Sequence, residues 1–314
     1  MDIAVYAVII AIGALEFFLH RNSDFYFDDV GYVERGLSLL RDNFHGFNGT
    51  PELVQPPGLP VIIAAISAVI GSTYATLLRA MAVFCTLGLL ATYELLRREE
   101  SRKVAATVCL LLGSSSMYFS MATRGVFPLF PYMLAAVLAL LAARKAEAAP
   151  TGQSRMMWAT LTALLVVAAL MIESRGVALL SGLFAWTATS FFIDRPRALA
   201  RLKTFLPVLI LGVAVQGWWM YRAPSSSDWP LPGYPASYLS QLLLKVGNFP
   251  ELGMASPVDM VTRVGRNLLS GTAALGELLT HHWISPLWSS PAVAGIVMLV
   301  LLGVGYSLWR TGAA

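Results

Sequence analysis

The chain has 314 residues, of which 57% are hydrophobic and only 13% are charged, and its mean hydropathy is +0.66. Soluble domains carry about 25% charged residues, so this composition excludes an ordinary soluble enzyme and predicts a membrane protein. The formal net charge of +4 is too small to indicate nucleic acid as a partner.

Several apolar runs approach the roughly 20 residues that a bilayer-spanning helix needs. They lack the alternation of barrel strands, so we predict an all-α polytopic membrane protein with about eight transmembrane helices. The predicted spans lie near 3–20, 76–96, 104–121, 127–143, 157–173, 176–193, 204–221 and 289–309. The first run has no basic leading region and no small-residue cleavage site, so we expect an anchoring helix. Glu16 within it is expected to face the protein interior, because a charge facing lipid is costly.

The apolar segment 57–71 is short, and a run of this length favours a re-entrant or interfacial helix over a span. If it does not cross, short loops on one side receive most of the basic residues, which the positive-inside rule places in the cytoplasm. These residues are Arg97, Arg98, Arg102, Lys103, Arg144, Lys145, Arg155, Arg195, Arg197, Arg201, Lys203 and Arg310. The N-terminus is then cytoplasmic. The alternative, in which segment 57–71 crosses, turns the basic loops outward and is disfavoured.

The first outer loop, 21–76, contains the adjacent acids Asp28 and Asp29. Apolar residues at helical spacing follow them as far as residue 41, which indicates an amphipathic juxtamembrane helix. The two acids suit the start of a helix or a catalytic centre, and both interpretations can hold together. The second outer loop, 223–288, begins rich in proline and serine and then shows weak helical patterning over 236–245 and 258–279.

Arginines stand at the outer ends of three predicted spans, at Arg124, Arg175 and Arg222. Such arginines usually reach lipid headgroups, but a shared side with Asp28 also suits a phosphate-bearing lipid, whose geometry the guanidinium fork matches. Glu173 beside Arg175 is either an ion-pair partner or part of the same site. No HExxH, P-loop, GxSxG or cysteine metal spacing occurs in the sequence, and Cys85 is expected to be a free packing residue, as is Cys109.

Taken in order, these motifs resemble the C-type membrane glycosyltransferases (GT-C fold), in particular the protein O-mannosyltransferase and aminoarabinose transferase relatives. The resemblance covers roughly residues 1–222. It rests on Asp28-Asp29-x-x-Tyr32, on Pro56-Pro57-Gly58-Leu59-Pro60, on Arg124 within SSSMYFSMATRGVFPLFPY and on Arg175 within IESRGVALL.

The resemblance implies a seven-span module over 1–222 with a catalytic acid in the first outer loop. The second outer loop, 223–288, and a last transmembrane helix with a short cytoplasmic tail, 289–314, would follow. The implied activity is the inverting transfer of a sugar from a polyprenyl-phosphate donor to a glycan, lipid or protein acceptor on the non-cytoplasmic face. Asp28 is the expected base, and Asp29 would orient the acceptor or hold an ion. The expected residues binding the donor are Tyr32, Arg124, Glu173, Arg175 and Arg222.

The chain also departs from these relatives. They commonly carry a second acid shortly after the arginine matched by Arg124, where this sequence reads Gly-Val-Phe-Pro-Leu. Relatives are usually longer, so we expect a short variant or a chain that lacks a C-terminal part. No cofactor is expected with certainty, and a divalent cation on the carboxylate pair stays open. Two alternatives also stay open, a lipid or sugar transporter and a non-catalytic homologue in a membrane assembly. The absence of eukaryotic targeting signals favours a bacterial inner membrane.

Overall fold

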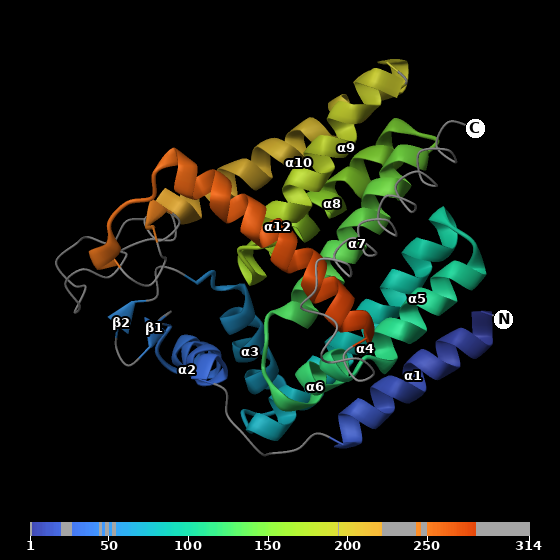
Figure 1. Ribbon diagram of the computed structural model, residues 1–314. Coiled ribbons are helices and arrows are strands. Elements are labelled where there is room, and N and C mark those ends of the chain that lie inside the picture. The colour runs from blue at the N-terminus through green and yellow to red at the C-terminus, as the bar shows by residue number, and fades with distance from the viewer. Residues whose placement is uncertain are drawn as a thin grey trace.

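The computed structural model describes residues 2–19, 27–43, 46–47, 50–51, 55–193, 195–221, 243–245 and 250–280. Nearly all of these residues are helical (Figure 1). In chain order the elements are α1 (Asp2–Leu19), α2 (Phe27–Asp42), β1 (Gly46–Phe47), β2 (Thr50–Pro51), α3 (Gly58–Val69), α4 (Tyr74–Glu99), α5 (Arg102–Ser114), α6 (Ser116–Arg124), α7 (Leu129–Ala148), α8 (Gly152–Ile172), α9 (Gly176–Ile193), α10 (Arg195–Tyr221), η1 (Pro250–Leu252) and α12 (Pro257–Thr280). The two short strands pair in antiparallel fashion.

Within the described part of the chain, five helices are long and apolar enough to cross a membrane. They are α4, α7, α8, α9 and the Ala198–Tyr221 portion of α10. The protein is therefore a multi-pass membrane protein, as the composition predicted. The first predicted span corresponds to α1, an 18-residue helix, whereas the last, 289–309, lies outside the described residues.

The prediction of one continuous span over 104–121 is wrong. The chain forms α5, of 13 residues, and α6, of 9 residues, and each is shorter than a bilayer crossing requires. Between them Ser115 adopts an extended conformation, with φ −64° and ψ 126°. Ser115 lies in a run of three serines, whose side chains compete for backbone hydrogen bonds and favour helix ends over helix interiors. Hydropathy is insensitive to such a break.

The helices place the chain's basic loops together, at what we term the basic end of the bundle. Arg144 on α7 contacts Glu99 at the end of α4, and Arg201 near the start of α10 contacts Glu147. The N-terminal helix begins at this same end, because Asp2 lies 3.8 Å from Arg97. The opposite end, termed the Asp29 end, joins the start of α4 to the end of α6.

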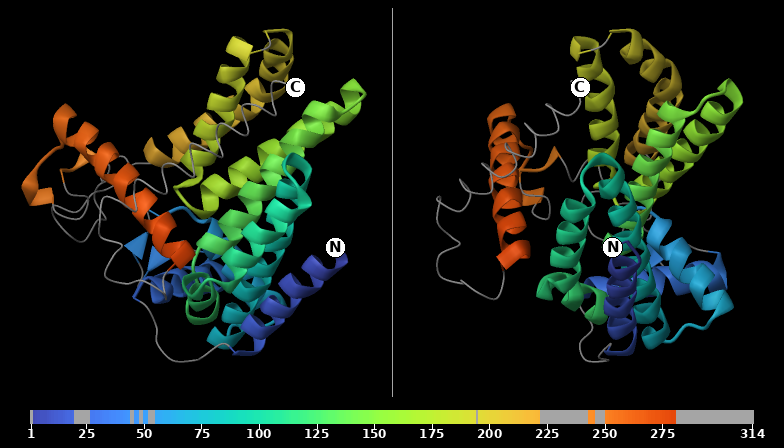
Figure 2. Two further views of the ribbon diagram at one scale, coloured as in Figure 1. Left: turned by 45° about the vertical axis from the view of Figure 1, so that its right-hand side comes forward. Right: turned by 90° about the vertical axis from the view of Figure 1, so that its right-hand side faces the viewer.

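The start of α2 lies at the Asp29 end, because the side chain of Asp29 contacts that of Tyr74 at the start of α4. The intervening helix α3 has 12 residues, too few to cross a bilayer. The predicted short helix is thus present, and its length is below that of the five candidate spans. Figure 2 shows α2 and α3 on one side of the bundle and α12 on the other.

The start of α12 is fixed by a reciprocal pair of hydrogen bonds between Ser256 and Asp259. The Ser256 amide donates to the Asp259 carboxylate at 3.0 Å, and the Asp259 amide donates to the Ser256 hydroxyl at 3.2 Å. These bonds, led by that from the Ser256 amide, hold the pKa of Asp259 below its usual value. This capping box explains why the helical pattern predicted over 258–279 begins where it does. The other predicted segment, 236–245, lies mostly outside the described residues.

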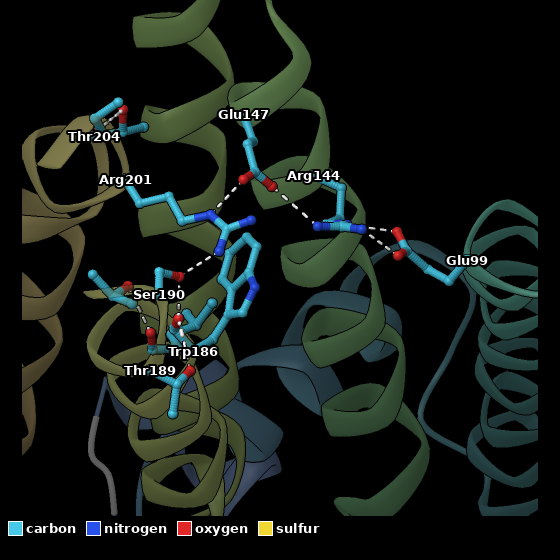
Figure 3. A network of polar contacts seen from close by, with 11 residues as sticks. Glu99, Arg144, Glu147, Trp186, Thr189, Ser190, Arg201 and Thr204 are labelled. Carbon is cyan, nitrogen blue, oxygen red and sulfur yellow. Dashed lines mark hydrogen bonds and ion pairs between the residues drawn. The ribbon is translucent and has the colours of Figure 1, made fainter. Parts of the chain in front are cut away.

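Four helices are tied together at the basic end by one polar network (Figure 3). Arg144 contacts both Glu99, at 2.5 Å from Nε, and Glu147, at 3.0 Å from Nη1. Arg201 of α10 contacts Glu147 and also Ser190 of α9. The ring of Trp186 lies against both guanidinium groups, at 4.6 Å from Arg201 and 5.6 Å from Arg144. Two acids and two bases compensate each other, so the network joins α4, α7, α9 and α10 without net charge.

Replacing Glu147 with glutamine should destabilise the bundle, because both arginines lose a shared carboxylate. Hydrogen bonds to charged groups are worth roughly 1.5–3 kcal/mol, so we expect a lower unfolding temperature for Glu147→Gln in detergent. The double variant Glu147→Gln/Arg201→Gln tests the pairing. It should cost less than the sum of the two single changes, and strictly additive losses would contradict a shared network.

Candidate functional site

The Asp29 end contains a buried carboxylate at the start of α2. The helix begins at Phe27, so the acid pair falls in its first turn, where the helix dipole favours negative charge. The Asp29 side chain is fully buried, while the side chain of Asp28 lies outside what the structure describes. Burial of a carboxylate is costly unless hydrogen bonds compensate it, so the partners of Asp29 decide what it can do.

Tyr74 is the residue that links Asp29 to the rest of the bundle. Its hydroxyl donates to Oδ2 of Asp29 at 2.8 Å and lies 3.2 Å from the carbonyl oxygen of Arg124. Thr73 fixes this position, because its side chain caps α4 by accepting from the amide of Thr76 at 3.2 Å. The Tyr74 hydroxyl therefore joins three segments that are distant in sequence: the start of α2, the start of α4 and the end of α6.

Sequence reasoning missed Tyr74. The available signal was a capping threonine followed by an aromatic residue at the first position of a span. That pattern is also typical of the aromatic belt at a membrane surface, and nothing local distinguishes the two. The structure places the predicted Arg124 at the last position of α6 with an exposed side chain, so its guanidinium is accessible at the same end as Asp29.

The other predicted pair, Glu173 and Arg175, occupies the tight turn between α8 and α9. The amide of Gly176 donates to the carbonyl of Glu173 at 2.8 Å, and a Cβ at Gly176 would lie 2.7 Å from the Cα of Leu170. Only glycine fits so close to backbone, and the turn leaves Arg175 exposed. Tyr132 of α7 donates to the carbonyl of Arg175 at 3.4 Å. Among the described residues no ion pair joins Glu173 to Arg175, so that alternative is not supported.

Helix α3 lies between the residues around Asp29 and the turn that contains Glu173 and Arg175. A Cβ at Gly58 would lie 2.4 Å from the carbonyl oxygen of Met171, so the start of α3 sits directly on the end of α8. On its other side, Ile63 of α3 fills the space above Gly36 of α2, where a Cβ would be 2.5 Å from its Cγ2. Helices α2 and α3 therefore pack together as one unit. Asp29 and Tyr74 lie beside this unit, and so does the turn that contains Glu173, at the same end of the bundle.

Arg35 strengthens this unit. Its guanidinium donates to the side-chain oxygen of Gln55, just before α3, and it lies 5.8 Å from the ring centre of Tyr32. Tyr32 is partly buried and packs against the core that includes α4 and α6. The predicted substrate-binding Tyr32 is thus engaged in helix packing in this structure. Arg222 lies outside the described residues.

The described part of the chain brings no three His, Cys, Asp or Glu residues close enough to hold a metal ion. The two cysteines, Cys85 and Cys109, are buried and free, as the sequence predicted.

Comparisons with known proteins give a result at the level of the fold. No model of a protein family matches the sequence, and no curated protein matches it. Among solved structures, the chain is similar to ArnT from Cupriavidus metallidurans bound to undecaprenyl phosphate, with a TM-score of 0.54 and 14% identity over 95% of this chain. It is also similar to the archaeal oligosaccharyltransferase AglB from Archaeoglobus fulgidus in complex with an inhibitory peptide and a dolichol-phosphate, with a TM-score of 0.52 and 14% identity over 97% of this chain.

These neighbours are longer proteins. The match covers 59% of the ArnT chain and 37% of the AglB chain. At 14% identity the likeness concerns the course of the backbone, and it holds over nearly all of this chain. The protein therefore has the GT-C fold, and the similarity assigns it to no particular member of that class.

Proposed function

We propose that this protein is a membrane glycosyltransferase that moves a sugar from a polyprenyl-phosphate donor to an acceptor at the Asp29 end. The observation that carries the proposal is the buried Asp29 carboxylate, held by Tyr74 beside Arg124. An acid fixed in this way at one end of a membrane bundle suits catalysis at a water boundary. The two solved neighbours, bound to undecaprenyl phosphate and to a dolichol-phosphate, support the class of donor.

The proposed reaction is a single displacement at the anomeric carbon. The acceptor hydroxyl or amine attacks, the bond from the anomeric carbon to the phosphate oxygen breaks, and the polyprenyl phosphate leaves with the electron pair. Asp28 takes the acceptor proton as general base. Attack opposite the leaving group inverts the anomeric configuration, as in one-step displacements at glycosidic carbons.

In this proposal Asp29 and Tyr74 position the reacting acid. The two aspartates are adjacent in the first turn of α2, so the hydrogen bond of the Asp29 side chain holds the backbone that carries Asp28. The hydrogen bond from Tyr74 holds α2 against α4 at this point. Asp29 either orients the acceptor or contributes to binding a divalent cation.

The arginines are proposed to bind the phosphate. Arg124 and Arg175 present exposed side chains at this end of the bundle, and Arg222 is proposed to join them. A guanidinium group donates two parallel hydrogen bonds to phosphate oxygens, which stabilises the charge that grows on the leaving group. Glu173 and Tyr32 are proposed to contact the sugar, with the lipid tail between the spans.

The membrane orientation belongs to the same proposal. The basic end is placed in the cytoplasm by the positive-inside rule, so the Asp29 end faces the periplasm or cell exterior. We propose a bacterial inner membrane as the location. The acceptor is a glycan, lipid or protein that approaches from the water outside.

Replacing Asp28 with asparagine should abolish sugar transfer, because the amide cannot accept the proton. General bases contribute roughly 10²- to 10⁴-fold to rate, so activity should fall by about that factor while the protein inserts and folds normally. Transfer is measured with purified protein and a polyprenyl-phosphate sugar in detergent. Asp42→Asn, an exposed acid at the far end of the same helix, is the matched control.

Normal transfer by Asp28→Asn would rule out the assignment of the base. Mass spectrometry of lipid co-purified with the wild type tests the donor separately, and a polyprenyl-phosphate sugar is expected. Solute movement across sealed vesicles without transfer in detergent would favour the transporter alternative.

Replacing Tyr74 with phenylalanine should lower the rate of transfer by about tenfold or more, because one hydrogen bond to a buried carboxylate is lost. The donor KM should change little, since the phosphate-binding arginines stay in place. Tyr221→Phe, at an exposed tyrosine at the end of α10, serves as the control. An unchanged kcat for Tyr74→Phe would show that the phenol does not position the acid pair.

A further inference from the structure

A second buried acid lies away from the Asp29 end, within α1. Glu16 is fully buried, as the sequence predicted for an acid inside an apolar segment. Among the described residues, no group makes a hydrogen bond of normal geometry to either of its carboxylate oxygens. The proposed transfer reaction does not use this residue, so its placement calls for a separate explanation.

The groups that face Glu16 are weakly polar. α1 packs against α4, α5 and α6, and these helices contribute the buried thiols of Cys85 and Cys109 and the buried hydroxyl of Tyr118. The Cys85 thiol interacts with the Glu16 carboxyl. The Tyr118 hydroxyl donates to the sulfur of Met133 at 3.5 Å, and the Cys109 thiol lies 3.8 Å from the carbonyl of Leu89.

Charged residues on the same helices are engaged elsewhere. Arg79 of α4 lies over the ring of Phe17, 5.6 Å from its centre. At the other end of α1, the hydroxyl of Tyr6 donates to Glu94 at 3.0 Å, and Asp2 lies 3.6 Å from Arg102 of α5. Arg124 ends α6 at the Asp29 end. None of these described groups forms an ion pair with Glu16.

The seam between α1 and α4 leaves little room for water beside the carboxyl. One turn before Glu16, a Cβ at Gly13 would lie only 1.9 Å from Oγ1 of Thr86, so the two helices touch closely at this glycine. Thr86 in turn donates to the carbonyl of Ala82 at 2.8 Å and offers no hydrogen to the acid. An ionised carboxyl needs several strong hydrogen bonds or water, and this seam supplies neither.

We propose that Glu16 is a proton-binding site that locks α1 to the bundle. The neutral acid is compatible with the apolar seam between α1, α4 and α6. Loss of the proton creates a charge that must be hydrated, which requires α1 to separate from α4.

The expected dependence on pH follows from proton linkage. In the unfolded chain a glutamate titrates at about pH 4.3, whereas the described part of the folded protein offers the Glu16 carboxylate oxygens no hydrogen-bond partner that would stabilise the ionised acid. The folded state therefore binds more protons above this point, and stability falls as pH rises until Glu16 ionises in the folded protein. Above that pH the stability of the folded protein no longer falls because of Glu16.

Thermal unfolding in lipid nanodiscs between pH 5 and pH 9 tests the proposal. Glu16→Gln keeps the shape of the neutral acid but cannot ionise, so it should match the wild type at pH 5 and unfold at least about 3 °C above it at pH 9. Glu251→Gln, at an exposed glutamate in η1, should keep the pH dependence of the wild type. Parallel curves for the wild type and Glu16→Gln would overturn the proposal.

A chemical readout decides the matter if Glu16→Gln does not fold. A membrane-soluble carbodiimide adds to neutral carboxylic acids, so the peptide containing Glu16 should gain the mass of the reagent in the folded wild type. Labelling should drop about tenfold for each pH unit beyond the point at which Glu16 ionises. Labelling that is absent, or that does not change with pH, would overturn the proposal.

Discussion

The hydrogen bond between the Tyr74 hydroxyl and the buried Asp29 carboxylate is the interaction on which the arrangement of the Asp29 end depends. Asp29 is fully enclosed, and a carboxylate in such surroundings is tolerated only with directed hydrogen bonds. Because the same phenol also lies at the carbonyl of Arg124, it fixes α2, α4 and α6 relative to one another. The backbone of Arg124 consequently has a defined place next to Tyr74, and the Arg124 side chain is exposed at this end.

The two ends of the bundle are held by different means. At the basic end, arginines and glutamates from three helices share a compensated network, which tolerates water because its members are partly exposed. At the Asp29 end, glycines bring backbones into contact, and α3 lies between α2 and α8. Close backbone contact holds α2, α3 and α8 together there, and the side chains of Arg124 and Arg175 remain exposed at that end.

Much of the fold could be predicted from the sequence, because hydropathy and loop charge act locally. The helical character, the short helix at 58–69 and the gathering of basic loops follow from apolar length and the distribution of arginine and lysine. The break at Ser115 could not be predicted in this way, since α5 and α6 have the composition of one apolar run. For the candidate site, the sequence indicates Asp29 and Arg124 individually. It does not indicate Tyr74, because the role of this residue depends on contacts with residues 45 and 50 positions away in the sequence.

The break at Ser115 makes α6 a short separate helix with a contact near each of its ends. This nine-residue helix is separated from α5 by extended backbone, and it bears Tyr118 near one end and Arg124 at the other. At 1.5 Å of rise per residue, these two points lie about 9 Å apart along a rigid rod. A displacement of α6 along its axis would therefore move both points together, Tyr118 beside the Cys85 thiol beneath α1 and the Arg124 carbonyl beside the Tyr74 hydroxyl.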